Sequence, residues 1–223
     1  DNSICDPTLT SPAVQFNGTV TATVTNMVGV LGDYNFSFGG GAGVQGATPA
    51  NHNRFNQLNG GITYNATTTH TLTGCVSPAA TVQVLNNQNL PDLTTSSNGS
   101  TNCIPTLEDG QARVVTVDTN PATLTGFTFA WTGPAGFSVA TNPTRNAIQL
   151  EDVQGGAAFN YTVLVTNLSN GCRNTAVVNV ADEKILPALS LAATDNSICD
   201  PTLTSPAVQF NGTVTATVTN MVG

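Results

Sequence analysis

The first 29 residues of the chain return unchanged at its end. Residues 1–29 and residues 195–223 both read DNSICDPTLTSPAVQFNGTVTATVTNMVG, at an offset of 194 residues. Self-similarity at a fixed period is the sequence mark of a repeat architecture. A closed domain has no reason to begin and end on the same segment, whereas a window cut from a tandem array does. We therefore expect the parent protein to carry many copies of a 194-residue unit.

A weaker repeat of half that length lies inside the unit. The motif Cys-x-Pro-Thr-Leu begins at Cys5, Cys103 and Cys199, in steps of 98 and 96 residues. A Gly-Cys pair follows in each complete half, at Cys75 and Cys172. Each half is large enough to bury a core of its own. The predicted domains are residues 1–90, residues 91–186 and, as a linker with the first strands of the next copy of the first domain, residues 187–223.

The local pattern predicts β-strands throughout. Residues 18–26 and 112–118 alternate apolar residues with polar ones, as a half-buried strand does. Further alternating runs start at Tyr34, Phe127 and Tyr161, and turns rich in Gly, Pro and Asn separate the runs. No stretch has a sustained helical period. About 97 residues of short strands is the size of an immunoglobulin-like sandwich. We expect antiparallel, all-β Ig-like sandwiches in tandem, arranged as a linear rod.

The composition argues against some classes of binding partner. Five Lys and Arg stand against thirteen Asp and Glu, for a net charge of −8. No basic stripe exists to neutralise phosphates, which argues against nucleic acid and against an anionic membrane surface. No run has the length of a membrane span. A surface of Thr, Asn, Ser and Gly would let identical chains lie side by side, although an inert spacer surface explains it equally.

The cysteines follow the half repeat. Cys5 and Cys75 are 70 positions apart, and Cys103 and Cys172 are 69 apart. These matched separations predict one disulfide in each domain, with Cys199 awaiting a partner further along the chain. Disulfides imply an oxidising, extracellular setting. The pairing requires Cys103 to lie early in, or beside, the first strand of its domain; unpaired buried thiols are the alternative.

No constellation of residues predicts catalysis, a cofactor or a metal. His52 and His70 occupy unmatched positions and no Cys-x-x-Cys exists, so zinc is not expected. The glycine-rich residues 38–43 lack the Gly-Lys-Ser/Thr of a phosphate loop. Carboxylates at a domain junction could bridge calcium, but Asp-x-Asp spacing is missing. The acidic residues considered are Glu108, Asp109, Glu151 and Asp152, interpreted as solvated turns, and Asp182, Glu183 and Asp195, at the junction.

Three motifs resemble a known group of modules. Residues 160–172 (NYTVLVTNLSNGC) are similar to the YTVTVT…NGC ending of Ig-like and polycystic-kidney-like repeats in surface proteins of Bacteroidota. Ser-Ile-Cys199 resembles the opening of these modules, and Phe129-Ala-Trp131 resembles their central aromatic strand. In the first half, residues 67–73 stand in place of the tyrosine-led strand and Phe38 in place of Trp131. The resemblance implies type IX secretion in giant adhesins, gliding filaments or grappling-hook filaments.

These observations predict a structural protein and not an enzyme. We expect Trp131 and Phe38 to lie in the cores of the two domains. We expect the chain to be a repeat segment of a long extracellular filament or adhesin shaft at the cell surface. Other copies of the same chain are the expected partners, in a homo-oligomeric bundle. A carbohydrate-binding or other ligand-binding Ig-like module and an accessory region of a secreted enzyme are the alternatives. A discrete polymerising subunit, whose tail completes a neighbour's fold, is the alternative to a continuous array.

Overall fold

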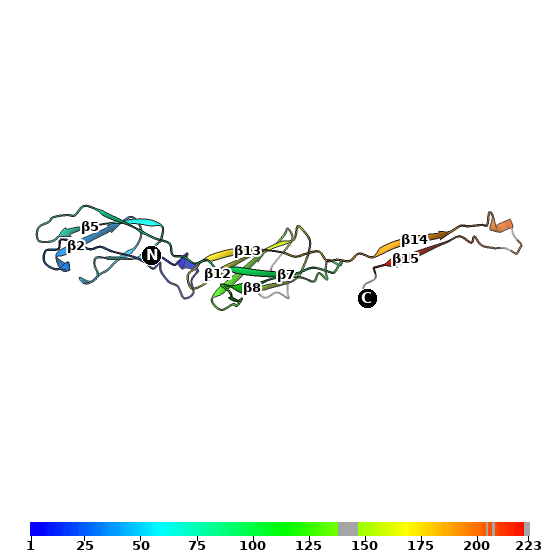
Figure 1. Cartoon of the computed structure of the whole chain (residues 1–223), viewed down its shortest axis with the longest axis horizontal. Helices are drawn as coiled ribbons and strands as arrows, with labels where there is room; N and C mark the ends of the chain where they lie inside the picture. Colours follow the sequence, from blue (N-terminus) through cyan, green and yellow to red (C-terminus); the bar gives the residue numbers. More distant parts are fainter. Residues whose placement is uncertain (138–146, 204, 207, 221–223) are drawn as a thin grey trace.

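The computed structural model describes residues 1–137, 147–203, 205–206 and 208–220. Their regular structure consists of β-strands and the short 3-10 turns η1 (Pro7–Leu9), η2 (Leu31–Asp33) and η4 (Pro201–Leu203). All paired strands among them run antiparallel. Three groups of strands follow one another in chain order in Figure 1. The predicted antiparallel all-β fold is confirmed.

The first sandwich consists of two sheets, with strand orders β1-β4-β3 and β2-β5-β6. Its core draws Val20, Phe55 and Leu58 from one sheet and Tyr64 and Val84 from the other, so the two sheets pack face to face. The ring of Phe38 stacks on that of Phe55 across this core, at 5.2 Å between centroids. The strands are β1 (Gly18–Thr21), β2 (Tyr34–Gly39), β3 (Val44–Gln45), β4 (Arg54–Leu58), β5 (Ile62–His70) and β6 (Ala80–Val84).

The second sandwich repeats this plan with sheets of order β11-β8-β7, to which β9 adds at β8, and β10-β12-β13. Trp131 lies in its core with 5% of its surface exposed, and the indole Nε1 donates to the carbonyl of Ala147 at 3.0 Å. The strands are β7 (Leu93–Asn98), β8 (Gly110–Val117), β9 (Asn120–Pro121), β10 (Phe127–Thr132), β11 (Gln149–Val153), β12 (Asn160–Asn167) and β13 (Arg173–Asn179).

The register makes Phe38 and Trp131 counterparts. Phe38 pairs with Ala66 on β5, and Trp131 pairs with Val163 on β12. Each of these partners lies two residues after a buried tyrosine, Tyr64 or Tyr161. The expectation that residues 67–73 replace a tyrosine-led strand is therefore wrong, because Tyr64 near the start of β5 is the counterpart of Tyr161.

Both tyrosines close a corner of their sandwich in the same way. The hydroxyl of Tyr64 donates to the carbonyl of Asn59 at 3.2 Å, and that of Tyr161 donates to the carbonyl of Gln154 at 3.1 Å. A buried tyrosine that bonds back to upstream backbone is a known feature of Ig-like sandwiches. Burial raises the pKa of Tyr161 to about 12.

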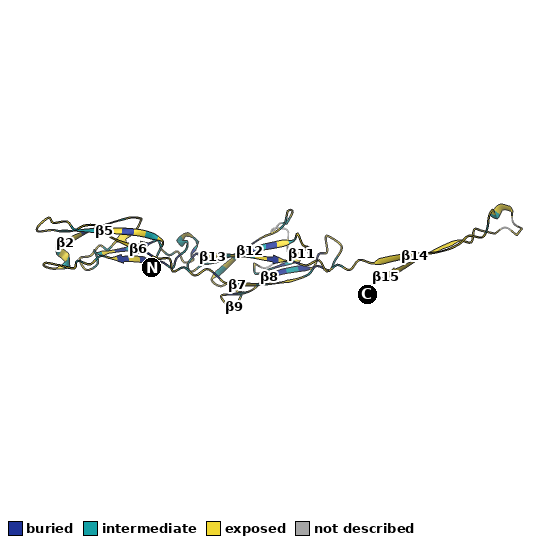
Figure 2. Ribbon diagram, turned by 45° about the horizontal axis from the view of Figure 1, so that its top comes forward, coloured by how far each residue is buried: buried dark blue, intermediate teal, exposed yellow. Residues whose placement is uncertain are grey.

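A hairpin of β14 (Ala188–Thr194) and β15 (Thr213–Thr219) follows the second sandwich. Thr194 pairs with Thr213, as Asn98 pairs with Gln111 at the matching position of β7 and β8. All residues of β14 and β15 are exposed, and Figure 2 colours the hairpin yellow, whereas dark blue alternates along strands of the sandwiches. The hairpin of β14 and β15 therefore has the same pairing as β7 and β8, the first two strands of the second sandwich. β15 also repeats the sequence around β1.

Candidate functional site: the joint between the two sandwiches

The two cysteines of the first sandwich lie at opposite ends of it. Near Cys5, the amide of Asn2 donates to the carbonyl of Leu85 at 2.9 Å, beside the start of β5. At the last residue of β5, the amide of His70 donates to the carbonyl of Cys75 at 2.9 Å. The nine residues of β5 span about 26 Å at roughly 3.3 Å per residue. A disulfide requires Cα atoms within about 7 Å of each other.

The second sandwich has the same arrangement. The amide of Ser100, close to Cys103, donates to the carbonyl of Ala181 at one end. The amide of Asn167, the last residue of β12, donates to the carbonyl of Cys172 at the other end. The predicted disulfides Cys5–Cys75 and Cys103–Cys172 are therefore wrong, because a strand length separates the cysteines of each predicted pair.

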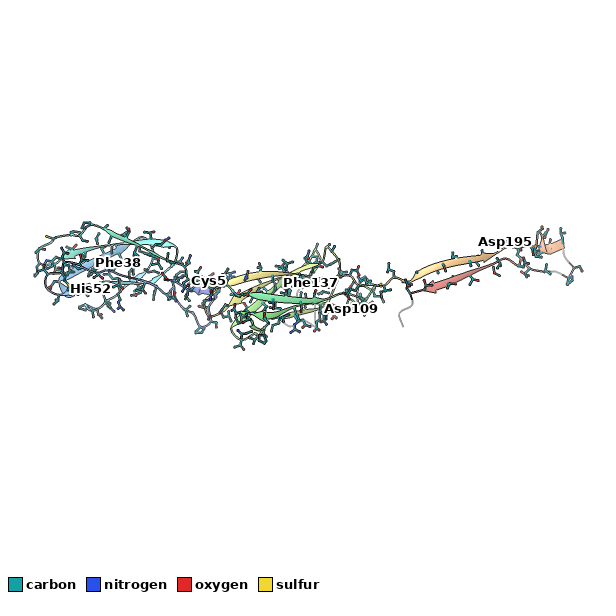
Figure 3. The ribbon with its side chains drawn as sticks, in the orientation of Figure 1. Cys5, Phe38, His52, Asp109, Phe137 and Asp195 are labelled. Carbon is teal, nitrogen blue, oxygen red and sulfur yellow. A yellow bond between two sulfur atoms is a disulfide. The ribbon has the colours of Figure 1, made fainter. Side chains whose placement is uncertain are left out.

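Cys5 is instead bonded to Cys172, which belongs to the next sandwich. The two residues are 167 positions apart in sequence and their Cα atoms are 4.9 Å apart. In Figure 3, Cys5 lies between the sandwiches, while Asp109 lies toward the far end of the second one. We call residues 5–11 the first opening loop and residues 167–173 the second cysteine hairpin, and their contact is the joint.

Backbone hydrogen bonds and an ion pair surround the disulfide. The amide of Cys5 donates to the carbonyl of Asn170 at 2.8 Å, and the amide of Ser11 donates to the carbonyl of Leu168 at 2.9 Å. The guanidinium of Arg173 contacts the carboxylate of Asp6 at 3.3 Å. Both charged side chains are partly exposed, so the ion pair adds orientation more than stability.

A glycine allows the two elements to approach. Gly171 has φ 69°, a left-handed conformation that favours glycine, and a Cβ there would collide with the backbone of Asp6. Its counterpart Gly74 in the first sandwich has φ 70°, but a Cβ there would meet nothing within 4 Å. The turn is thus the same in both hairpins, and only the second one is occupied by an opening loop.

The main-chain connection between the sandwiches packs on the joint too. The side-chain amide of Gln88 donates to the carbonyl of Ile4 at 2.8 Å, and that of Asn174 donates to the carbonyl of Pro91 at 2.8 Å. Pro91 and Cys172 are both fully buried. Most residues of the connection are exposed, but these bonds and buried Pro91 tie it to both sides of the joint, so it does not act as a free linker.

Hydrogen bonds from Thr8 orient the carboxylate of Asp6 in the joint. The carboxylate accepts from the hydroxyl of Thr8 at 2.6 Å and from its amide at 3.0 Å. These bonds, chiefly the hydroxyl, lower the pKa of Asp6, and the neighbouring Arg173 lowers it further. Asp6 is therefore ionised at neutral pH. Asp200, in the identical second segment, accepts the same two bonds from Thr202, so this local geometry forms without the joint.

The remaining cysteines are Cys75, Cys103 and Cys199, all described by the structure. Each is exposed and forms no disulfide. Unpaired buried thiols, the alternative weighed from the sequence, are also wrong for these three residues.

The histidines considered for metal binding serve the fold. His52 Nε2 lies 2.8 Å from the carbonyl oxygen of Tyr34, and His70 Nδ1 lies 2.9 Å from the hydroxyl of Thr73. Among the described residues, no group of three or more His, Cys, Asp or Glu side chains could hold a metal ion. The same residues contain no helix that is long and apolar enough to cross a membrane.

The acidic pair Glu108 and Asp109 belongs to the second opening loop, residues 103–109. Buried Glu108 accepts from the hydroxyl of Ser100 at 2.6 Å and contacts Lys184 Nζ at 3.4 Å. Hydrogen bonds from the hydroxyl and amide of Thr101 lower the pKa of Asp109 to about 2. The interpretation as a solvated residue is therefore wrong for buried Glu108, whereas Asp109 is exposed, and its carboxylate bonds within the loop region to Thr101.

A cavity of about 810 Å³ lies at this far end of the second sandwich. Leu107, Glu108 and Asp109 line it from the opening loop, and Phe137 and Tyr161 from the sandwich. The far end of the second sandwich is thus hollowed beside an opening loop.

No known protein-family model matches this chain, and no curated protein sequence matches it.

Both cysteines of the joint are singled out by the half repeat, but the residues that surround them are not. Asp6 and Arg173 directly follow Cys5 and Cys172, whereas Ile104 and Val76 follow Cys103 and Cys75. The residues that follow the two bonded cysteines are therefore both charged, and those that follow Cys103 and Cys75 are both apolar. This matched chemistry is the signal in the sequence that points to which cysteines pair.

Proposed function

We propose that this chain is a structural repeat segment of a long extracellular filament or adhesin shaft, with no catalytic role. The observation that carries the proposal is the joint. A disulfide, backbone hydrogen bonds and a connection that is hydrogen-bonded to the joint link successive sandwiches. Such a link suits a protein that transmits position and load along its length. Domains joined in this way form a linear rod whose reach grows with the number of units.

The terminal hairpin supports a tandem array. β15 repeats the sequence around β1, and β14 pairs along one edge of it. Within the described residues, β1 pairs with β4 alone and leaves its other edge open. In an array, the β14 of the preceding unit would occupy that edge and complete the first sandwich. On this proposal, domain boundaries near residues 90 and 186 lie in short connections rather than in free linkers.

The setting and partners follow from the same features. A structural disulfide is typical of an oxidising compartment outside the cytosol, which supports the cell surface as the location. The resemblance to Bacteroidota surface repeats supports export as an adhesin or filament. Identical polar faces at every unit would let neighbouring chains form a bundle through many weak contacts that add by multivalency.

Small-angle scattering on chains of increasing length tests the proposal. The present chain is compared with versions that carry one and two additional 194-residue units. A rod predicts that the maximum dimension increases by a constant amount, about 65–70 Å per unit, because each of its two sandwiches is about ten strand residues long at roughly 3.3 Å per residue. A compact particle, or an increment that falls as units are added, would contradict it. Sedimentation over a range of concentrations then tests the bundle.

A discrete polymerising subunit makes a different prediction for the unextended chain. Residues 195–223 of one molecule would complete the first sandwich of a neighbour and displace the identical residues 1–29 of that neighbour. The unextended chain would then form concentration-dependent polymers in which a spectroscopic label on β1 becomes mobile. A monomer whose β1 label stays immobile at all concentrations supports the continuous array.

A further inference from the structure

The joint defines a rule for pairing cysteines. The opening cysteine of one sandwich, Cys5, bonds to the hairpin cysteine of the following sandwich, Cys172. Cys103 and Cys199 are the opening cysteines of the second sandwich and of the terminal hairpin, and Cys75 is the hairpin cysteine of the first sandwich. Each of these three is exposed and unbonded in this structure. If the same rule held along a tandem array, the partner of each would belong to a neighbouring unit.

The hairpin around Cys75 has the conformation of the hairpin around Cys172. In the first, the amide of Gly74 donates to the carbonyl of His70 at 2.8 Å. In the second, the amide of Gly171 donates to the carbonyl of Asn167 at 2.8 Å. The two glycines differ in φ by one degree, and only the space in front of Gly74 is open. The first hairpin is shaped to receive an opening loop and holds none.

The residues that follow the cysteines match in chemical character. In the observed joint, Asp6 faces Arg173 as an ion pair. At the same positions, Ile104 follows Cys103 and Val76 follows Cys75, so the ion pair is replaced by two apolar side chains. Ile104 is 52% exposed and Val76 is 64% exposed. Either apolar residue would mismatch a charged partner, but the two fit each other.

Further apolar surface lies beside both exposed cysteines. Leu107 is exposed on the loop of Cys103, and Leu72 is exposed on the hairpin of Cys75. The repeated leucine of the opening motif supplies an internal comparison. Leu9, in the observed joint, is partly buried, whereas Leu203, in the identical segment with no sandwich beyond it among the described residues, is 83% exposed. Exposure at Leu107 is thus the state of a joint that has not been made.

We propose that the first sandwich binds, through the hairpin of Cys75, the second opening loop of the preceding unit, with a disulfide between Cys75 and that unit's Cys103. By the same rule Cys199 bonds to the next unit's counterpart of Cys172. This inference rests on the proposed tandem array. The shaft then has a disulfide at every joint, and two kinds of joint alternate, one with an ion pair and one with an apolar pair.

The opening loops of the two kinds of joint also differ in length. Thirteen positions separate Cys5 from Gly18, but seven separate Cys103 from the equivalent Gly110. The longer loop contains Ser11, whose amide bonds to Leu168. In the shorter loop, the residue six positions after Cys103 is Asp109, which directly precedes β8 and whose carboxylate bonds to Thr101.

Bond formation is an oxidation. The two thiols lose two protons and two electrons to a disulfide oxidant, such as oxidised glutathione or a thiol–disulfide oxidoreductase. The oxidant's own disulfide is reduced to two thiols, and one sulfur–sulfur bond forms between the sandwiches.

The test uses the chain extended by one 194-residue unit and treated with oxidised glutathione. Free thiols are alkylated, and peptides are mapped by mass spectrometry without reduction. We expect a peptide that joins Cys103 of the first unit to the second unit's counterpart of Cys75. Alkylation of both thiols, or a link within one sandwich, would overturn the proposal. Scattering on the same sample reports the array separately, since an extended particle with free thiols contradicts only the disulfide.

Variants test the apolar match. Ile104→Asp in the first unit places a carboxylate against Val76, and we expect the yield of the new link to fall by about tenfold, the effect of a buried charge without a partner. Adding Val76→Arg in the second unit recreates the ion pair and should restore the link. A yield that Ile104→Asp leaves unchanged would contradict this packing. Formation of the Cys5–Cys172 link is the control for folding in each variant.

Discussion

Residues 1–29 and 195–223 have one sequence and two environments. In both, a side-chain amide closes the opening loop in the same way: Asn17 accepts from the amide of Ser3 at 2.8 Å, and Asn211 accepts from the amide of Ser197 at 2.8 Å. Burial differs between the copies. Val20 in β1 is 9% exposed, while the identical Val214 in β15 is 71% exposed.

This comparison separates what the segment encodes from what its neighbours supply. Hydrogen bonds between residues close in sequence form in either environment, so the shape of the opening loop is local. Strand length is not local, because β1 ends at Thr21 and β15, paired with β14, continues through the counterpart of Thr25. The core, the joint and the strand ends all require the rest of a sandwich.

The largest effect should come from the core of a completed sandwich. Trp131→Ala should lower the free energy of unfolding by about 3–5 kcal/mol, as large truncations in cores do. Leu191→Ala, on exposed β14, is the control and should change it by less than about 0.5 kcal/mol. Urea unfolding followed by circular dichroism measures both. Equal effects would mean that the hairpin is as well packed as the sandwich.

The next effect concerns the same cysteine in the two copies. Cys5→Ser removes the disulfide and should cost about 2–4 kcal/mol through greater freedom of the unfolded chain. Cys199→Ser changes the identical residue of the second copy, where it is exposed and unbonded, and should cost nothing measurable. Thermal unfolding should split into two transitions only for Cys5→Ser. A single unchanged transition would show that the connection alone couples the sandwiches.

A smaller effect should distinguish the two valines. Val20→Ala should cost about 1–2 kcal/mol because two buried methyl groups are lost. Val214→Ala should be neutral in the present chain, and in a chain extended by one unit it should cost as much as Val20→Ala. Chemical denaturation of these three variants, each compared with its unsubstituted chain, makes this measurement. If Val214→Ala stays neutral after extension, the hairpin does not begin a third sandwich.

The smallest effect lies in the two aspartates of the opening motif. Bonds from Thr8 and Thr202 lower the pKa of Asp6 and Asp200, respectively, and Arg173 lowers only that of Asp6 further. The folded pKa lies below the unfolded value, so any stabilisation is present above pH 3.8 and is lost as the pH falls through the folded pKa. Titration by NMR should give Asp6 the lower value, and Arg173→Gln should abolish the difference. Identical values before that substitution would mean that the ion pair does not form in solution.

The sequence predicted the strands well because alternation is a local signal. Residues 112–118 fall almost wholly within β8, and the runs that begin at Tyr34, Phe127 and Tyr161 fall in β2, β10 and β12. The cysteine pairing failed because matched separations say nothing about which end of a sandwich a cysteine occupies. Tyr64 was missed because the polar residues after it hide the alternation that is evident after Tyr161.

The bond between Cys5 and Cys172 has a topological consequence for damage. It closes a covalent ring that contains the whole connection between the sandwiches, residues 85–92. A protease that cuts one peptide bond anywhere in this ring leaves both pieces attached through sulfur. Separating the two sandwiches requires two breaks, one in the connection and a second either at the disulfide or in the chain beside one of its cysteines.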